Sequence, residues 1–86
     1  MTFDELRDIV LDSLFDLKLI SEAEHDRLRN DRASDVDLAS LPLDSMKVVD
    51  WCLALEAKVK REVQVEELIE NDTLNRLAKH LAAHRP

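Results

Sequence analysis

Apolar residues near the N-terminus recur every three or four positions, which is the spacing of one face of an α-helix. Thr2 and Glu5 stand three residues apart, as in a capping box at a helix start. The pattern predicts a first helix that begins at Thr2 and ends at about residues 15–17. Its apolar face would consist of Leu6, Ile9, Val10 and Leu14.

A shorter helical segment is predicted over residues 22–29. Ser21 and Glu24 repeat the capping-box spacing, and the residues that follow favour helix. Only Ala23 and Leu28 would anchor this segment, so we expect it to be mostly exposed. The next stretch, residues 30–41, is expected to be a loop held by the apolar side chains of Val36, Leu38 and Leu41.

The longest stretch with helical spacing predicts a helix over residues 45–61. Trp51 lies at one edge of its apolar face and is expected to be a partly buried lid on the core, with an indole N–H that needs a partner. Cys52 is interpreted as a small buried hydrophobic residue. The core face would consist of Val48, Val49, Cys52, Leu55 and Val59, extended by Met46 and Leu53.

Two helical segments are predicted in the last third of the chain. Residues 65–70 would form one or two turns, and Asp72 would cap the helix that follows. His80, His84 and Arg85 near the end of that helix suit the negative pole of its dipole. The buried stripe of this helix would consist of Leu74, Leu77, Ala78 and Leu81.

Composition supports an all-α fold. Glycine is absent and the only prolines are Pro42 and Pro86, so tight hairpins have no residue that favours a positive φ. Cys52 is the only cysteine, which excludes a disulfide within the chain. No apolar run has membrane-spanning length and the N-terminus is charged, unlike a signal peptide. We expect a single domain over residues 1–86, cytoplasmic and without membrane insertion.

The charge of the chain is unevenly distributed. The net charge is −7, and residues 1–44 hold 12 of the 19 acidic residues but only 5 of the 12 basic ones. An acidic chain with few aromatic residues and no basic cluster is a poor candidate for nucleic-acid binding. Partners with basic surfaces are expected instead.

The sequence offers little for catalysis or metal binding. Ser45 has no base in a recognisable signature, and the glycine-rich loop of serine hydrolases is missing. His80 and His84 share a helix face but lack a third ligand nearby. We therefore expect no self-contained enzyme. Three loop acids without the glycine and glutamate of an EF-hand, Asp31, Asp35 and Asp37, are interpreted as solvated.

The start of the helix over residues 45–61 has two readings. Asp44 or Ser45 could be the N-cap, since these residue types dominate that position. Ser45 could also be an exposed hydroxyl to which a group is attached. The surrounding motif favours the second reading, because apolar residues flank the Asp-Ser pair on both sides. It reads Leu41-Pro42-Leu43-Asp44-Ser45-Met46.

Together with three later segments, this motif resembles the acyl carrier and peptidyl carrier proteins, which bind phosphopantetheine. Their attachment motif is commonly written L-G-x-D-S-L. The likeness covers about residues 35–82. The later matching segments are Val48-Val49-Asp50-Trp51-Cys52-Leu53-Ala54-Leu55-Glu56, Glu62-Val63 with Glu66, and Thr73-Leu74 with Leu77.

The resemblance implies a small four-helix bundle of the acyl-carrier type, with three long helices, one short helix and an extra short helix in the first loop. It implies that a phosphopantetheinyl transferase attaches 4′-phosphopantetheine to Ser45, and that Asp44 orients the serine or the metal of the transferase. Acyl or aminoacyl groups would be held on the arm as thioesters. The residues expected to contact partner enzymes are Leu43, Met46, Lys47, Asp50 and Trp51.

Three departures from the family pattern indicate a free-standing carrier for a specialised pathway, which we expect to be a monomer. Pro42 replaces the usual glycine, Lys47 stands where many members carry an acid, and residues 22–29 add a segment. Polyketide, nonribosomal peptide, modified lipid and aminoacyl-transfer chemistry all remain open. The implied partners are a loading ligase and a downstream synthase or transferase. The alternative is a non-enzymatic helical interaction module, with Ser45 as a cap.

Overall fold

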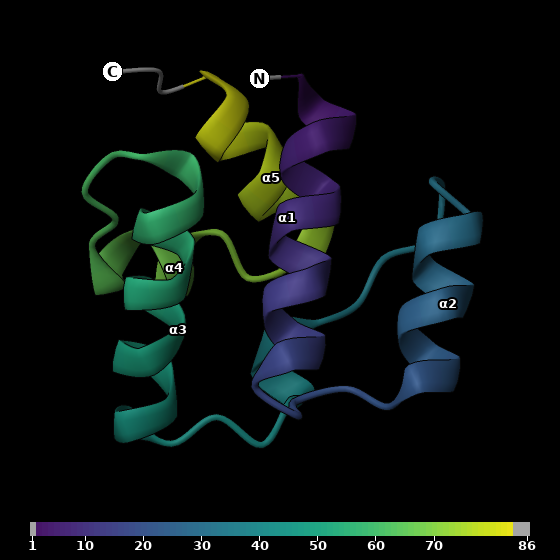
Figure 1. The fold of residues 1–86 in the computed structure, drawn as a ribbon, viewed down its shortest axis with the longest axis horizontal. Helices are drawn as coiled ribbons and strands as arrows, with labels where there is room; N and C mark the ends of the chain where they lie inside the picture. Colours follow the sequence, from purple (N-terminus) through teal and green to yellow (C-terminus); the bar gives the residue numbers. More distant parts are fainter. Residues whose placement is uncertain (1, 84–86) are drawn as a thin grey trace.

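The computed structural model describes residues 2–83 and contains five α-helices and one 3-10 turn within that range (Figure 1). The predicted all-α fold is confirmed. His84 and Arg85, expected at the end of the last helix, lie outside the described residues. The elements are α1 (Phe3–Asp16), α2 (Glu22–Asn30), η1 (Leu38–Ser40), α3 (Ser45–Val59), α4 (Val65–Glu70) and α5 (Leu74–Ala83).

Helix α1 is the centre of the bundle. Thr2 and Glu5 form the predicted capping box, since the Thr2 hydroxyl accepts the Glu5 amide and the Glu5 carboxylate accepts the Thr2 amide. The helix packs most extensively on α5 and then on α3 and α2 (Figure 1). Burial of its apolar face, which supplies most of the driving force, involves Leu6, Val10, Leu11 and Leu14.

Helix α2 lies on the outer side of α1, away from α3 and α4 (Figure 1). Ser21 caps it, as the spacing predicts, by accepting the Glu24 amide. Leu28 is fully buried, but Ala23 is exposed, so the expectation that Ala23 anchors the helix is wrong. One buried residue is little apolar area for a helix of two and a half turns, and polar contacts supply the remaining attachment.

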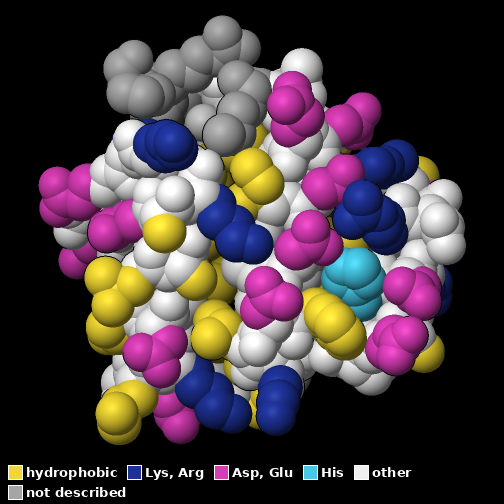
Figure 2. Space-filling view, viewed as in Figure 1, with side chains coloured by type: hydrophobic (Ala, Val, Ile, Leu, Met, Phe, Trp, Pro, Cys, Tyr) yellow, Lys and Arg dark blue, Asp and Glu magenta, His cyan; other side chains and the backbone are white. Residues whose placement is uncertain are grey.

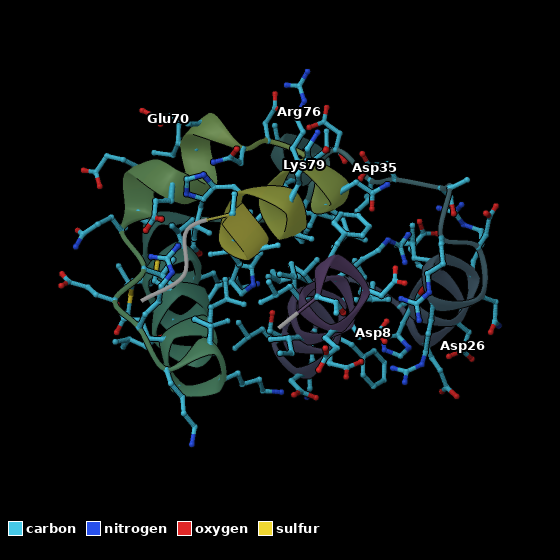
Figure 3. All side chains as sticks on the ribbon, turned by 90° about the horizontal axis from the view of Figure 1, so that it is seen from above. Asp8, Asp26, Asp35, Glu70, Arg76 and Lys79 are labelled. Atoms are coloured by element: carbon cyan, nitrogen blue, oxygen red, sulfur yellow. The ribbon has the colours of Figure 1, made fainter. Side chains whose placement is uncertain are left out.

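Those polar contacts join α2 and the loop after it to α1. The His25 ring bonds to the Asp12 carboxylate at 2.7 Å and packs on Phe15, with ring centroids 5.0 Å apart. Arg32 forms a two-pronged ion pair with Asp8, which lies between α1 and α2 (Figure 3). Ion pairs and hydrogen bonds therefore add to the burial of Leu28 in attaching α2 to α1.

Helix α3 is rotated relative to the prediction. Trp51 is only 1% exposed, so it is a core residue rather than a partly buried lid. Its indole N–H donates to the Ser13 hydroxyl at 2.8 Å, and Ser13 in turn donates to the Val10 carbonyl. Val49, expected on the core face, is exposed instead. Cys52 and Leu55 are buried as predicted, and Val48 and Val59 pack against the core. Met46 and Leu53, expected to extend the core face, are exposed, so this part of the prediction is wrong.

Two long helices end without glycine. Lys18 follows α1 with φ of 60°, and Lys60 ends α3 with φ of 58°. The left-handed conformation costs a residue with a Cβ atom about 1–2 kcal/mol. The chain accepts this cost at helix ends, where a left-handed residue satisfies free carbonyls.

The last two helices pack as predicted, with one correction. Leu68 of α4 and the whole expected stripe of α5 are buried. Thr73, rather than Asp72, occupies the capping position, because its hydroxyl accepts the Arg76 amide at 3.1 Å. The Asp72 carboxylate instead pairs with the Arg76 guanidinium at the surface.

None of the helices that the structure describes between residues 2 and 83 combines the length and the apolar character needed to cross a membrane.

The contact between His25 and Asp12 should make the docking of α2 depend on pH. The hydrogen bond that His25 donates to the Asp12 carboxylate raises the pKa of His25, burial opposes the shift, and Asp26 adds to it. A raised folded-state pKa stabilises the fold fully below the unfolded value near 6.5, and the stabilisation is lost as pH rises through the folded value. We predict that stability falls over this window. Urea unfolding at several pH values gives the free energy of unfolding of the wild type and of His25→Gln. If this free energy depended on pH equally in both proteins, the prediction would be wrong.

Candidate functional site

The turn before α3 assigns the capping role to Asp44. Its backbone is extended, with φ of −102° and ψ of 177°, and its carboxylate accepts the Lys47 amide at 2.8 Å. This is the geometry of an N-cap residue. Ser45 is the first residue of the helix and does not cap it.

Ser45 is exposed and its side chain is not used by the fold. Within residues 2–83, no hydrogen bond or ion pair joins its hydroxyl to another group. Because Asp44 accepts the free amide at the helix start, the serine is not needed as a cap. The hydroxyl is thus available for a covalent group, and it lies at the positive pole of a fifteen-residue helix.

Pro42 forms a tight turn just before this site. The Leu43 amide donates to the Leu41 carbonyl at 2.7 Å, which closes a three-residue γ-turn around the proline. An inverse γ-turn needs φ near −75° at its central residue, and proline is held close to that value. The residue that replaces the family's glycine therefore makes the approach to Ser45 rigid.

An apolar cavity of about 190 Å³ lies between the loop before α3, α3 itself and α4. Leu43 and Val48 belong to its wall and flank Ser45 within one helical turn. Asp72 places a single carboxylate among otherwise apolar side chains. The complete lining is Leu38, Ala39, Leu43, Val48, Trp51, Leu68, Ile69 and Asp72.

Beside the cavity, apolar side chains form an exposed stripe. Met46 is 76% exposed, and Val49 and Leu53 follow at helical spacing with 48% and 58%. Ile69 of α4 is 69% exposed. Figure 2 shows hydrophobic side chains gathered on the side of the molecule where α3 lies. We call Met46, Val49 and Leu53 of α3 the apolar stripe.

The other predicted contact residues are divided between surface and core. Leu43 is half-buried in the cavity wall, and Lys47 and Asp50 are exposed beside the apolar stripe. Trp51 does not reach the surface, so the prediction that it contacts partners is wrong. Its bond to Ser13 explains why: the indole is held toward α1.

His80, expected to suit the negative pole of the last helix, is bonded to a side chain of α4. His80 bonds to the Glu67 carboxylate at 2.8 Å, and Arg61 donates to the same oxygen at 2.9 Å. Burial alone would raise the pKa of Glu67, but hydrogen bonds from Arg61, the Gln64 amide and His80 lower it to about 2. This cluster ties the start of α4 to α5. Within residues 2–83, no three metal-binding side chains form a group.

Sequence reasoning missed the cavity wall contributed by η1 and α4. Leu38 and Ala39 come from a stretch expected to be loop, and Ile69 from a short helix with no clear face. One signal was present: Leu68 and Ile69 are adjacent, so both cannot be buried on one side of a helix.

A small helical bundle that presents an unused serine hydroxyl at a helix start, beside an apolar cavity, is the architecture of a carrier domain. The family model described as "Phosphopantetheine attachment site" matches residues 17–81. The chain therefore belongs to the phosphopantetheine attachment-site family, whose prosthetic group is 4′-phosphopantetheine. Comparisons with curated proteins and with solved structures give no match.

Mutation can test whether Asp44 alone caps α3. Asp44→Ala should lower the free energy of unfolding by about 0.5–2 kcal/mol, because the Lys47 amide loses its acceptor. Ser45→Ala should change it by less than about 0.5 kcal/mol, as for an exposed residue without contacts. Urea unfolding measures both. Equal losses would show that Ser45 shares the capping role.

Proposed function

We propose that Ser45 is the attachment residue and that the protein carries acyl or aminoacyl groups for a specialised biosynthetic pathway. The observation that carries this proposal is that the Ser45 hydroxyl is exposed and unpaired while Asp44 performs the capping. An exposed hydroxyl at a helix start has room for a large covalent group. The family match covers this position.

The attachment is a phosphoryl-type transfer made by a separate phosphopantetheinyl transferase. The Ser45 oxygen forms a bond to the phosphorus of the pantetheine phosphate, and the bond from that phosphorus to the adenosine bisphosphate of coenzyme A breaks. The proton of Ser45 passes to a base of the transferase. When bound, the arm supplies a terminal thiol that holds an acyl or aminoacyl group as a thioester.

The residues around Ser45 have separate roles in this proposal. The amide groups and positive pole at the start of α3 favour the negative charge of a phosphodiester. Asp44, which is exposed, keeps the helix start in place and can orient the metal of the transferase. The cavity beside Leu43 and Val48 offers apolar surface near the attachment point.

Partner enzymes would approach through the apolar stripe and the residues beside it. Leu43 and Met46 flank the attachment site, and Lys47 and Asp50 give the exposed side of α3 a mixed charge. A partner recognised this way gains more from apolar contact than from long-range attraction. The proposed partners are the transferase, a loading ligase and a downstream synthase or transferase. Those partners would perform the chemistry.

Modification of Ser45 is directly testable. Incubation with coenzyme A and a promiscuous phosphopantetheinyl transferase should raise the intact mass by one phosphopantetheine. Ser45→Ala should show no increase. Ser40→Ala is the control, because Ser40 is another exposed serine close in sequence, with its hydroxyl bonded to the Asp37 carbonyl, and the variant should gain the same mass as the wild type. A wild type that stays unmodified across several transferases would remove the proposal.

The docking role of the apolar stripe predicts a second result. Met46→Asp should lower kcat/KM for transfer by about tenfold or more, as expected when a central apolar contact is lost. Ala23→Asp, an exposed change on α2, is the control and should have little effect. If Met46→Asp abolished partner binding while Ser45→Ala preserved all function, the chain would be a helical interaction module instead.

A further inference from the structure

Arg7 is a fully buried charged residue at the junction of α1, α2 and α5. Its guanidinium donates hydrogen bonds to the Leu28 carbonyl at 2.5 Å, to the Asp31 carbonyl at 3.2 Å and to the Ser34 carbonyl at 2.7 Å. All three acceptors are backbone oxygens of α2 or of the loop that follows. Arginine can serve them together because its planar fork carries five N–H donors.

Asn75, in the first turn of α5, completes this junction. Its side-chain oxygen accepts from Arg7 Nε at 2.7 Å, and its side-chain nitrogen donates to the Ser34 carbonyl at 3.1 Å. Asn75 thereby contacts both the buried guanidinium and one of the carbonyls that the guanidinium holds. Such a shared network restricts the loop more than two independent bonds would.

The hydrogen bonds continue from Ser34 toward α5. The Asp35 carboxylate accepts a hydrogen bond from the backbone N–H of Asn75 at 2.9 Å, and Asp35 lies near the start of α5 in Figure 3. The Val36 carbonyl accepts the Leu74 amide at 3.1 Å. This part of the loop is therefore held along the N-terminus of α5.

Further backbone hydrogen bonds lead from this part of the loop to the turn before Ser45. The Leu38 amide donates to the Asp72 carbonyl at 2.8 Å, the Leu41 amide donates to the Leu38 carbonyl at 3.2 Å, and the γ-turn at Leu43 follows. Leu38 and Leu43 belong to the cavity wall. Asp44 then caps α3 beside Ser45.

We propose that Arg7 and Asn75 are positioning residues that hold residues 31–44 in place and so present Ser45 to the transferase. This inference rests on the proposed function. Neither side chain touches the attachment site. They act by keeping the loop in the arrangement that a partner binds, since affinity falls in proportion to the fraction of molecules in the competent state.

The test compares Asn75→Ala with the wild type and with Asn71→Ala. Asn71 also donates a part-buried side-chain hydrogen bond to a backbone carbonyl, that of Glu67, but it has no bond to residues 31–44. The fold of each variant is checked by circular dichroism. Asn75→Asp is a milder variant, because it removes the donor to Ser34 but keeps an acceptor for Arg7, and the negative charge of this acceptor can pair with the guanidinium.

Two measurements decide the proposal. Amide hydrogen exchange at Leu38, Leu41 and Leu43 should become faster in Asn75→Ala, by a smaller factor in Asn75→Asp, and not in Asn71→Ala. KM for the carrier in transferase-catalysed modification should rise about three- to tenfold in Asn75→Ala with kcat unchanged, a range set by the loss of one or two hydrogen bonds.

The results that would disprove the positioning role of Arg7 and Asn75 differ from those that would disprove attachment at Ser45. Unchanged exchange in the loop, or a KM that changes equally in Asn75→Ala and Asn71→Ala, would overturn the positioning role. Arg7→Lys keeps the positive charge but loses the fork, so it should change exchange in the same direction as Asn75→Ala. If the wild type is not modified at all, attachment at Ser45 fails, and the exchange data alone decide whether Arg7 and Asn75 hold the loop.

Discussion

The burial of Arg7 constrains the end of α2 and the segment that follows it. Burying a guanidinium away from water is costly unless its N–H donors have acceptors. Here the acceptors are the side-chain oxygen of Asn75 and three backbone carbonyls. Those carbonyls belong to α2 and the loop after it, so satisfying the charge also places that segment. The described side chains contain no buried polar atom left without a partner.

The division of labour between Asp44 and Ser45 is the local counterpart of this constraint. A helix start requires an acceptor for its free amides, and Asp44 supplies it. The neighbouring serine is therefore relieved of any structural role at the position most favourable to a negatively charged group. Pro42 adds stiffness through its γ-turn, so the absence of glycine makes the approach to the site more rigid.

Apolar and polar forces hold different parts of the molecule. Helices α1, α3 and α5 share an apolar core that includes Trp51, whereas α2 contributes one fully buried leucine and is also joined by ion pairs and hydrogen bonds. Ion pairs weaken as the salt concentration rises, and ion pairs of titratable groups also change with protonation. The contacts of α2 with α1 thus respond to salt and pH, and α2 adjoins the loop that leads to Ser45.

Local signals in the sequence determined the helices, their starts at Thr2 and Ser21, and the family motif around Ser45, because capping and periodicity involve residues only a few positions apart. The buried face of α3 was not determined in this way. Val49 and Trp51 are both apolar, but Trp51 is the one that lies in the core, where its indole N–H donates to the Ser13 hydroxyl, 38 residues away. The partners of Arg7 likewise come from segments up to 68 residues away. The tertiary structure decided these features because distant elements must meet before the acceptors exist.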